Sequence, residues 1–231
     1  MNNELKSSAL FALLLFLPTL LFSQTIGLCS LSSFEAYTGS GAVTNSGIFT
    51  GDVGTNSGVL TGFDDPDFSG SVYNNDAVTS EARIDLLRLY IQLSNIFVTH
   101  PGTHAAAFGS GETITAGTYS VIGAGSLGGM LTLDGEGDAD AVFVIKFKGA
   151  FTIGASSTII LSNGTRACNV FWIAEGAISV AAGSDVKGTL LSHQGAVSLA
   201  ANCNIEGRLL ATEGAITVGA GNTATAPMGP I

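Results

Sequence analysis

The chain is short of charge, and of positive charge above all. Only 11% of its 231 residues are charged, and 8 Lys+Arg stand against 18 Asp+Glu, which gives a formal net charge of -10 at pH 7. Nucleic-acid binding needs a basic surface that displaces counterions from phosphates, so this class is excluded. Disorder needs low hydrophobicity, whereas 46% of this chain is hydrophobic. The composition indicates a folded acidic protein of about one domain.

The sequence also lacks the short motifs of common enzymes. No G-x-S-x-G, H-E-x-x-H, P-loop or dinucleotide pattern occurs, and the glycine-rich stretch Gly123–Gly129 follows no phosphate-binding pattern. The acidic residues Asp64, Asp65 and Asp67 surround a proline, as in a turn. The string LDGEGDAD, which ends at Asp140, superficially resembles a calcium-binding loop but occurs only once, so we expect no calcium site there. We therefore predict that the protein is not an enzyme and binds no cofactor.

Histidine and cysteine supply no metal motif either. His100 and His104 flank Pro101 and cannot share a helical face, so we expect a pair of loop histidines, and His193 is expected on a rim. Cysteine is scarce and odd in number: Cys29, Cys168 and Cys203. An odd number in an exported protein leaves at least one thiol unpaired or bonded to another molecule. We interpret Cys168 and Cys203 as small buried hydrophobic residues.

The first segment is predicted to be a targeting signal rather than part of the fold. After Lys6, residues Leu10–Phe22 form an apolar run that is shorter than the roughly 20 residues needed to span a bilayer. We expect a signal peptide over residues 1–23, cleaved near Ser23 or Gln24, with an uncleaved anchor as the alternative. The mature chain is then secreted, with no membrane insertion after cleavage.

An internal repeat determines the expected architecture. The strings GAISVAAGSDVKGTLLSH, GAVSLAANCNIEGRLLAT and GAITVGAGNT begin at Gly176, Gly195 and Gly214, so that each starts 19 residues after the previous one. An earlier copy begins at Gly149, and a fainter echo begins at Gly41. Each unit contains three short strand-like segments separated by Gly or Asn. Three strands per unit predict a triangular solenoid whose coils pair about 4.8 Å apart.

Side-chain alternation assigns three faces to this solenoid. In the first segment of each unit the large apolar residues are predicted to point inward: Ile178, Val180, Val197, Leu199, Ile216 and Val218. The outward positions of that segment carry only small uncharged residues: Ala177, Ser179, Ala181, Ala196, Ser198, Ala200, Ala215, Thr217 and Gly219. A second face, with Asp185, Lys187, Asn204 and Glu206, is predicted to be an ordinary solvated surface.

The third face has two successive apolar residues in every coil: Phe171-Trp172, Leu190-Leu191 and Leu209-Leu210. One of each pair must face outward, so an apolar element is expected to cover this side. The period changes to helical over Thr79–Phe97, which predicts a helix over about residues 79–98 with Thr79 or Ser80 as N-cap. Its narrow polar strip would comprise Asp85, Arg88, Gln92 and Asn95. We expect this helix to lie on a ladder of Trp172, Leu191 and Leu210.

Several strings, together with the helix, occur in the order seen in a known family: AVTNSGIFTGDVGTNSGVLTGF (42–63), ITAGTYSV (114–121), LTLDGEGDADAVFVIKF (131–147), ACNVFW (167–172) and GRLLATEGAITV (207–218). They resemble the microbial ice-binding (antifreeze) protein family once labelled DUF3494, over about residues 34–226. The resemblance implies a mainly β fold, a discontinuous right-handed parallel β-helix (a triangular solenoid) with one long α-helix packed alongside. It also implies secretion and adsorption to ice through one flat β-face. The domain is then expected over 24–226, with 227–231 as a tail or linker.

The flat face implied by the resemblance coincides with the uncharged face derived from the repeat. Short side chains lose little entropy when they order water, and many weak contacts act together. The expected partner is an ice crystal surface, bound by a monomer without cofactor or metal. We predict ice binding through Thr44, Thr152, Ala177, Ser179, Ala181, Ala196, Ser198, Ala200, Ala215 and Thr217.

The sequence also departs from the family pattern. The Thr-Ala/Gly-x-Thr/Asn motif associated with the ice face of some members has its only match at residues 115–118. Glu175, Gln194 and Glu213 lie at the corner of the predicted face and would weaken binding if they tilted onto it. The alternative function is a cell-surface or matrix adhesion module that binds carbohydrate or another cell, which predicts an exposed aromatic platform. A natural chain continuing beyond Ile231 would make the protein cell-bound rather than free.

Overall fold

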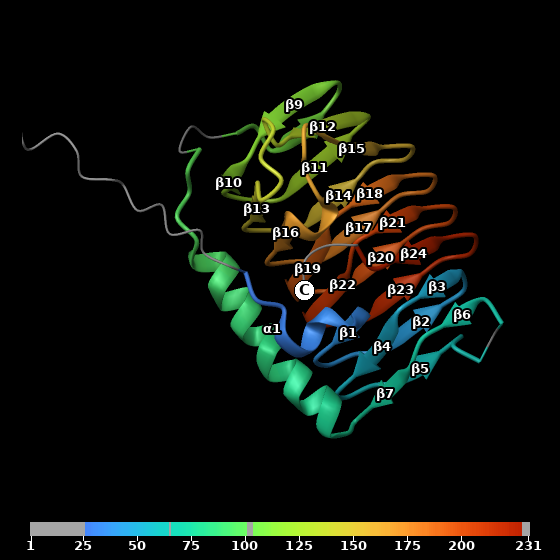
Figure 1. Ribbon diagram of the computed structural model, residues 1–231. Coiled ribbons are helices and arrows are strands. Elements are labelled where there is room, and N and C mark those ends of the chain that lie inside the picture. Colours follow the sequence, from blue (N-terminus) through green and yellow to red (C-terminus); the bar gives the residue numbers. More distant parts are fainter. Residues whose placement is uncertain (1–25, 65, 101–103, 228–231) are drawn as a thin grey trace, which may run out of the picture.

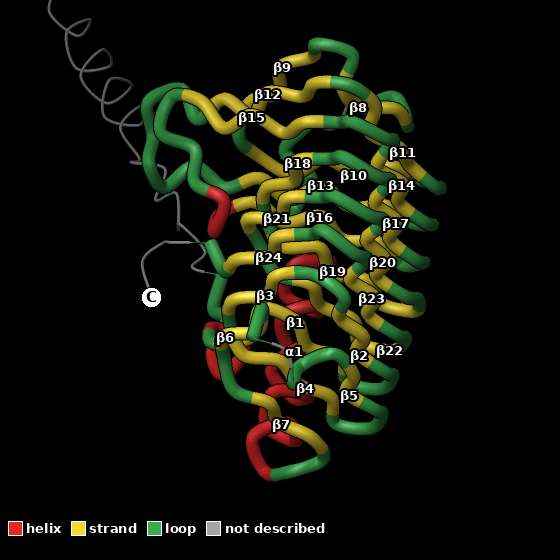
Figure 2. Tube along the Cα trace, turned by 90° about the vertical axis from the view of Figure 1, so that its right-hand side faces the viewer, coloured by secondary structure: helices red, strands yellow, loops and turns green. Residues whose placement is uncertain are grey.

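The computed structural model describes residues 26–64, 66–100 and 104–227, so the predicted signal peptide lies outside the described residues. The strands wind into a triangular stack of coils, and one α-helix lies along one side of that stack (Figure 1, Figure 2). The mainly β solenoid with one long helix is therefore confirmed. The helix of the described part is not long and apolar enough to span a membrane.

Three eight-stranded sheets form the sides of the stack, and every strand pair is parallel. Sheet A has the order β10 (Gly117–Val121), β13 (Phe143–Phe147), β16 (Val170–Ala174), β19 (Thr189–Gln194), β22 (Leu209–Glu213), β1 (Phe34–Thr38), β4 (Asp52–Thr55), β7 (Val72–Asn74). Sheet B has the order β5 (Leu60–Thr61), β2 (Val43–Asn45), β23 (Ile216–Val218), β20 (Val197–Leu199), β17 (Ile178–Val180), β14 (Phe151–Ile153), β11 (Gly125–Gly128), β8 (Ala107–Gly109). Sheet C has the order β6 (Phe68–Ser69), β3 (Ile48–Thr50), β24 (Thr223–Thr225), β21 (Asn204–Glu206), β18 (Asp185–Lys187), β15 (Thr158–Ser162), β12 (Met130–Asp134), β9 (Glu112–Thr115).

The stack is discontinuous in sequence, because the N-terminal coils pair with the C-terminal coil. Strand β1 lies between β22 and β4, β2 lies between β23 and β5, and β3 lies between β24 and β6. Thr44 is the register partner of Thr217, which confirms the faint repeat at Gly41. Figure 1 shows the blue first coil beside the red last coil. The helix is inserted after β7, before the second half of the stack begins.

The inside of the stack is a continuous apolar core. The predicted inward residues of sheet B, such as Ile178, Val197 and Ile216, are fully buried there. Trp172 also lies inside, where its ring stacks on Phe151 with ring centroids 5.4 Å apart and its Nε1 donates to the Lys187 carbonyl at 2.9 Å. The predicted place of Trp172 on the outer ladder is therefore wrong.

The register of β16 explains this correction. Trp172 pairs with Leu190, which points inward, whereas Ile173 pairs with Leu191. The outward ladder under the helix therefore runs through Ile173, Leu191, Leu210 and Tyr37. Leu191 and Leu210 were predicted correctly, and the third member lies one residue further along the chain than expected.

Helix α1 spans Ala77–Asn95, so it begins and ends earlier than the expected range of about 79–98. Neither Thr79 nor Ser80 is the N-cap. Asp76 takes that place, since its carboxylate accepts from Thr79 N at 2.8 Å while the Thr79 hydroxyl accepts from Asp76 N at 2.9 Å, a reciprocal capping box. At the other end, Lys146 Nζ donates to the carbonyl oxygens of Ser94 (3.2 Å) and Ile96 (2.7 Å). A cation at the helix C-terminus also complements the helix dipole.

The helix covers sheet A through Ala82, Leu86, Leu89 and Leu93, which pack on the outward ladder. Its predicted polar strip needs correction. Asp85 is buried. Its carboxylate accepts a hydrogen bond at 2.7 Å from the hydroxyl of Ser30, which belongs to the 3-10 helix η1 (Cys29–Ser32). Arg88 and Asn95 are exposed as predicted, and the solvent side also exposes apolar residues, among them Ile84, Leu87 and Ile91.

The three cysteines are free thiols, with Cys29 exposed, Cys168 half-buried and Cys203 buried. Only Cys203 fits the interpretation as a buried residue. Cys168 belongs to the 3-10 helix η2 (Ala167–Asn169), in the insertion between two coils. Pro227 is buried, so the first residue of the predicted tail 227–231 belongs to the folded part, and the rest of that tail lies outside the described residues.

Candidate functional site

The outward side of sheet B, called face B below, carries one aligned rank of small side chains across all eight strands. Register pairs connect each member to the next, from Thr61 to Thr44 and onward to Ala107. In spatial order the rank is Thr61, Thr44, Thr217, Ser198, Ser179, Thr152, Ser126 and Ala107. None of these side chains is charged or aromatic.

A second rank lies two residues before the first and is almost entirely alanine. Its carbonyl groups accept backbone hydrogen bonds from the next coil, as from Ile178 N to Ala196 O and from Ile216 N to Ala42 O, both at 2.9 Å. The rank comprises Val59, Ala42, Ala215, Ala196, Ala177, Ala150, Ala124 and Ala105. On the other side of the hydroxyl rank, Ala181 and Ala200 continue the surface with equally small side chains.

All ten predicted site residues therefore lie on one surface. Helix α1 contacts β16, β22 and β7, all in sheet A, so the described helix does not cover face B. Thr152, Ser179 and Thr217 are exposed, whereas Thr44 and Ser198 are partly exposed. With outward positions about 6.6 Å apart along each strand and coils about 4.8 Å apart, face B is a regular two-dimensional grid.

Glycines at the corner between sheets A and B allow the coils to stack this closely. A Cβ atom on Gly214 would lie 2.5 Å from the Gly195 carbonyl oxygen, and one on Gly41 would lie 2.3 Å from the Gly214 carbonyl oxygen. Gly214 and Gly41 also have positive φ angles of 117° and 147°. Only glycine meets both demands without strain. The corner is a close backbone stack that aligns the alanine rank beside it.

Buried hydroxyl and thiol groups brace both edges of sheet B from inside. At the corner with sheet A, Thr38 Oγ1 donates to the Gly214 carbonyl at 2.8 Å and Thr55 Oγ1 donates to the Gly41 carbonyl at 2.8 Å. At the corner with sheet C, Ser184 Oγ donates to the Ala181 carbonyl at 2.8 Å, and Cys203 occupies the equivalent place one coil on. Because each bond ties the turn of a coil to the strand beside it, the grid is expected to be stiff.

Sequence reasoning missed Thr61, Ser126 and Ala107 as members of the hydroxyl rank. For the first two a signal existed, because the pattern Gly-[Ala/Val]-x-[Ser/Thr] precedes each of them. The pattern begins at Gly41, Gly58, Gly123, Gly149, Gly176, Gly195 and Gly214. Each of these seven occurrences places a corner glycine, a small residue of the second rank and a hydroxyl of the first rank. An eighth occurrence, at Gly154, lies between β14 and β15, and its Ser157 is buried, so the string finds seven of the eight positions with one false match.

The family-like motif at residues 115–118 does not lie on face B. Thr115 ends β9 in sheet C, Gly117 begins β10 in sheet A, and Thr118 is buried. The motif therefore rounds the corner between sheets C and A at the end of the stack where β8, β9 and β10 lie.

Several histidines and acidic residues that were considered for metal binding or catalysis make local contacts within the fold. His100 stacks on Tyr119 with ring centroids 4.2 Å apart, and His104 Nε2 lies 2.6 Å from Glu112 Oε1. Asp134 accepts from Glu136 N and from Asn163 Nδ2, both at 2.8 Å. These bonds lower the pKa of the Asp134 carboxyl below its ordinary value. No cluster of His, Cys, Asp or Glu suited to a metal ion occurs among the described residues.

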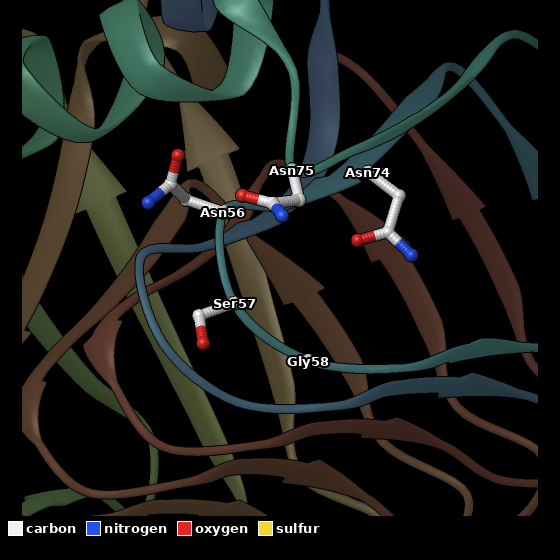
Figure 3. A pocket seen from close by; sticks show the side chains of 5 residues that line it. All are labelled: Asn56, Ser57, Gly58, Asn74 and Asn75. Atoms are coloured by element: carbon white, nitrogen blue, oxygen red, sulfur yellow. The ribbon is translucent and has the colours of Figure 1, made fainter.

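A polar pocket of about 430 Å³ lies where the first coils meet the start of α1. Asn56, Ser57, Gly58, Asn74 and Asn75 line it, and none of these residues titrates. Figure 3 shows the amide of Asn75 pointing toward Asn56 and the amide of Asn74 pointing away from both. The pocket offers hydrogen-bond donors and acceptors but no general acid or base among its lining residues that could activate the Ser57 hydroxyl.

The fold and face B together define a class of protein, a β-solenoid whose flat surface of small uncharged side chains is its most regular feature. Comparison with known proteins narrows this class to one family. The family described as ice-binding-like matches residues 37–224, and the chain belongs to it.

Individual relatives agree with this assignment. An ice-binding protein of Nostoc sp. (strain HG1) is 29% identical over 173 residues, which covers 74% of this chain and 63% of the relative. The crystal structure of an ice binding protein from an Antarctic bacterium, Flavobacteriaceae, superposes with a TM-score of 0.80 at 36% identity and covers 89% of this chain and 50% of that chain. The ice-binding protein of the Antarctic ascomycete Antarctomyces psychrotrophicus gives a TM-score of 0.77 at 29% identity, with 88% and 98% covered. The chain thus spans less than two thirds of the two bacterial relatives.

Proposed function

We propose that this protein is a secreted, non-catalytic monomer that binds ice through face B and so inhibits ice growth and recrystallisation. The observation that supports the proposal is the aligned rank from Thr61 to Ala107, which continues across eight strands without a charged or aromatic side chain. Family membership supports the same reading.

The physical mechanism follows from the grid and its side chains. Ala, Ser and Thr have few rotamers, so little conformational entropy is lost when they order a layer of water or contact a crystal plane. Each contact is weak, yet contacts made together on a rigid surface make detachment improbable. Ice between adsorbed molecules must then grow as curved fronts, which lowers its local freezing point.

The alternative function, an adhesion module for carbohydrate or cells, requires a platform of several exposed aromatic residues, and among the described residues Phe97, 82% exposed, has no exposed aromatic neighbour. Trp172, Tyr37 and Tyr119 are buried, and Tyr73 packs against Phe34 with ring centroids 5.6 Å apart. Tyr90 lies on α1 against His193.

The test places one bulky side chain on each of two faces of the same coil. Thr217→Tyr lies on face B, and Thr223→Tyr lies on the outward side of sheet C in the same coil. We expect Thr217→Tyr to lower thermal hysteresis, the gap between melting and freezing points, by about tenfold because the ring lifts the grid off the crystal. Thr223→Tyr should retain crystal shaping and recrystallisation inhibition. Equal behaviour of the two variants would favour the adhesion module.

A further inference from the structure

The corner between sheets A and B places charged side chains directly beside face B. Glu175 immediately precedes Gly176 and Ala177, and Ala177 belongs to the alanine rank. The neighbouring coils have Lys148 on one side and Gln194 on the other, where Gln194 N donates to the Glu175 carbonyl at 3.0 Å. A carboxylate retains bound water strongly, and stripping that water is costly. A carboxylate lying over the alanine rank would therefore oppose contact with a crystal plane.

The Glu175 carboxylate is held on the side away from face B. The Tyr90 hydroxyl from α1 lies 3.0 Å from Oε1 and 2.9 Å from Oε2 of Glu175. Lys148 Nζ lies 3.6 Å from Oε1, and the Glu175 side chain is 29% exposed. Since α1 packs on the outward side of sheet A, these contacts draw the carboxylate toward sheet A.

Tyr90 is itself held in a fixed orientation. Its ring stacks on the His193 ring with centroids 3.8 Å apart and an interplanar angle of 9°. His193 Nδ1 in turn lies 2.9 Å from Thr212 Oγ1 on the next coil. Burial first, and then the hydrogen bond and charge of Glu175, raise the pKa of Tyr90 to about 12. The phenol therefore remains a proton donor at neutral pH.

Glu213 provides an internal contrast at the same corner. It is the register partner of Gln194, and its side chain is exposed. Among the described residues, Glu213 forms no hydrogen bond with α1, whereas Glu175 accepts one from Tyr90 of that helix. A corner carboxylate is therefore not drawn to sheet A by its position alone; the Tyr90 hydroxyl does this for one coil.

We propose that Tyr90 is a positioning residue for face B, which holds the Glu175 carboxylate over sheet A and keeps that charge off the grid. This inference rests on the proposed ice-binding function. It assigns to α1 a role beyond covering the apolar ladder of sheet A.

The test combines Tyr90→Phe, Glu175→Gln and the double variant. Tyr90→Phe keeps the ring stack on His193 but loses the bond to Glu175, so thermal hysteresis should fall by about twofold as the carboxylate gains access to face B. Tyr90→Phe/Glu175→Gln should return to the wild-type value, because the charge that Tyr90 restrains is gone. The matched control is Glu213→Gln, which removes a corner charge that α1 does not hold: it should change thermal hysteresis by the same factor in the wild type and in Tyr90→Phe.

The outcomes separate this inference from a purely structural role and from the proposed function. If the variants are equally folded by thermal unfolding and Glu175→Gln restores activity, the inference holds. It is overturned if Tyr90→Phe retains full activity, if Glu175→Gln fails to restore it, or if Glu213→Gln raises the activity of Tyr90→Phe by a larger factor than it raises that of the wild type. Thr217→Tyr in the same assay tests ice binding by face B itself: retained activity there would overturn the proposed function, whatever the Tyr90 variants show.

Discussion

Face B and the outward side of sheet C, called face C below, are built on the same coils yet have opposite chemistry. Face C carries an ion-pair ladder in which Lys187 Nζ lies 3.0 Å from Asp185 Oδ1 and 3.4 Å from Glu206 Oε2. On face B the corresponding strands of those coils carry Ser179 and Ser198. Both sheets have the same strand pairing and coil spacing. The β-helix therefore supplies a grid on every side, and the outward side chains distinguish face B, the proposed ice-binding surface, from face C.

Adding charge to face B tests directly whether the chemical difference between face B and face C controls ice binding. Ser198→Glu places a carboxylate in the middle of the hydroxyl rank, and Asn204→Glu places one on face C in the next strand of the same coil. We expect Ser198→Glu to reduce thermal hysteresis by more than about tenfold, because a hydrated charge keeps the grid from the crystal. Asn204→Glu should leave thermal hysteresis unchanged. Equal losses would show that net charge, rather than its place, controls binding.

The backbone at the edge of face B should also tolerate an added side chain less well than the loops beside sheet C do. Gly214→Ala at the edge of face B adds a Cβ that would lie 2.5 Å from the Gly195 carbonyl oxygen, at a φ of 117°. Gly137→Ala, in the loop after β12, has a positive φ of 89° but no atom within 4 Å of the added Cβ. We expect Gly214→Ala to lower the free energy of unfolding by more than about 3 kcal/mol. For Gly137→Ala the expected loss is about 1 kcal/mol, from backbone strain alone.

Chemical denaturation with urea measures both losses. Similar losses for the two variants would mean that the corner relaxes around an added methyl group, and that close stacking of the glycines is not what aligns face B.

Much of face B could be predicted from the sequence because its signal is local and repeated. The 19-residue spacing of Gly176, Gly195 and Gly214 sets the coil, and alternation within four residues then decides which side chain faces outward. The same string occurs in the first and last coils, so Thr44 could be aligned with Thr217 although 173 residues separate them.

Features that depend on contacts between distant segments could not be predicted in this way. Phe171-Trp172 satisfies either register, and only the pairing of Trp172 with Leu190 decides that the indole lies inside. Asp85 resembles a surface residue of α1 until Ser30, 55 positions earlier, is placed against it. Tyr90 and Glu175 are 85 positions apart in the sequence, and no local sequence pattern predicts their contact.

A buried acid in β1, between β22 and β4 of sheet A, contrasts with the partly exposed charges of face C. Glu35 is fully buried where the register of β1 and β4 shifts, and its carboxyl oxygens have no hydrogen-bond partner among the described residues. Burial raises the pKa of Glu35 well above its ordinary value, and the nearby Arg208 guanidinium offsets this only in part.

The raised pKa has a definite sign for stability. The folded protein holds the Glu35 proton more tightly than the unfolded chain does, so protonation of Glu35 stabilises the fold. This contribution to the free energy of unfolding is complete below the unfolded pKa, about 4.3 for a glutamate, and is lost as the pH rises through the folded pKa. Glu35→Gln mimics the protonated acid and should raise the Tm at pH 8 by about 2–4 °C relative to the wild type, with little difference at pH 4. Thermal unfolding across this range checks the prediction, and a Tm difference that does not depend on pH would contradict it.

The smallest expected effect comes from the ladder that distinguishes face C. Lys187→Met removes the cation between Asp185 and Glu206, whose side chains are 38% and 41% exposed. Solvent screens such pairs, so the free energy of unfolding should change by less than about 1 kcal/mol. The indole of Trp172 is unaffected, since it donates to the backbone carbonyl of residue 187. Thermal hysteresis should stay at the wild-type value. A marked loss would indicate that ice binds to face C instead of face B, because Lys187 lies on face C alone.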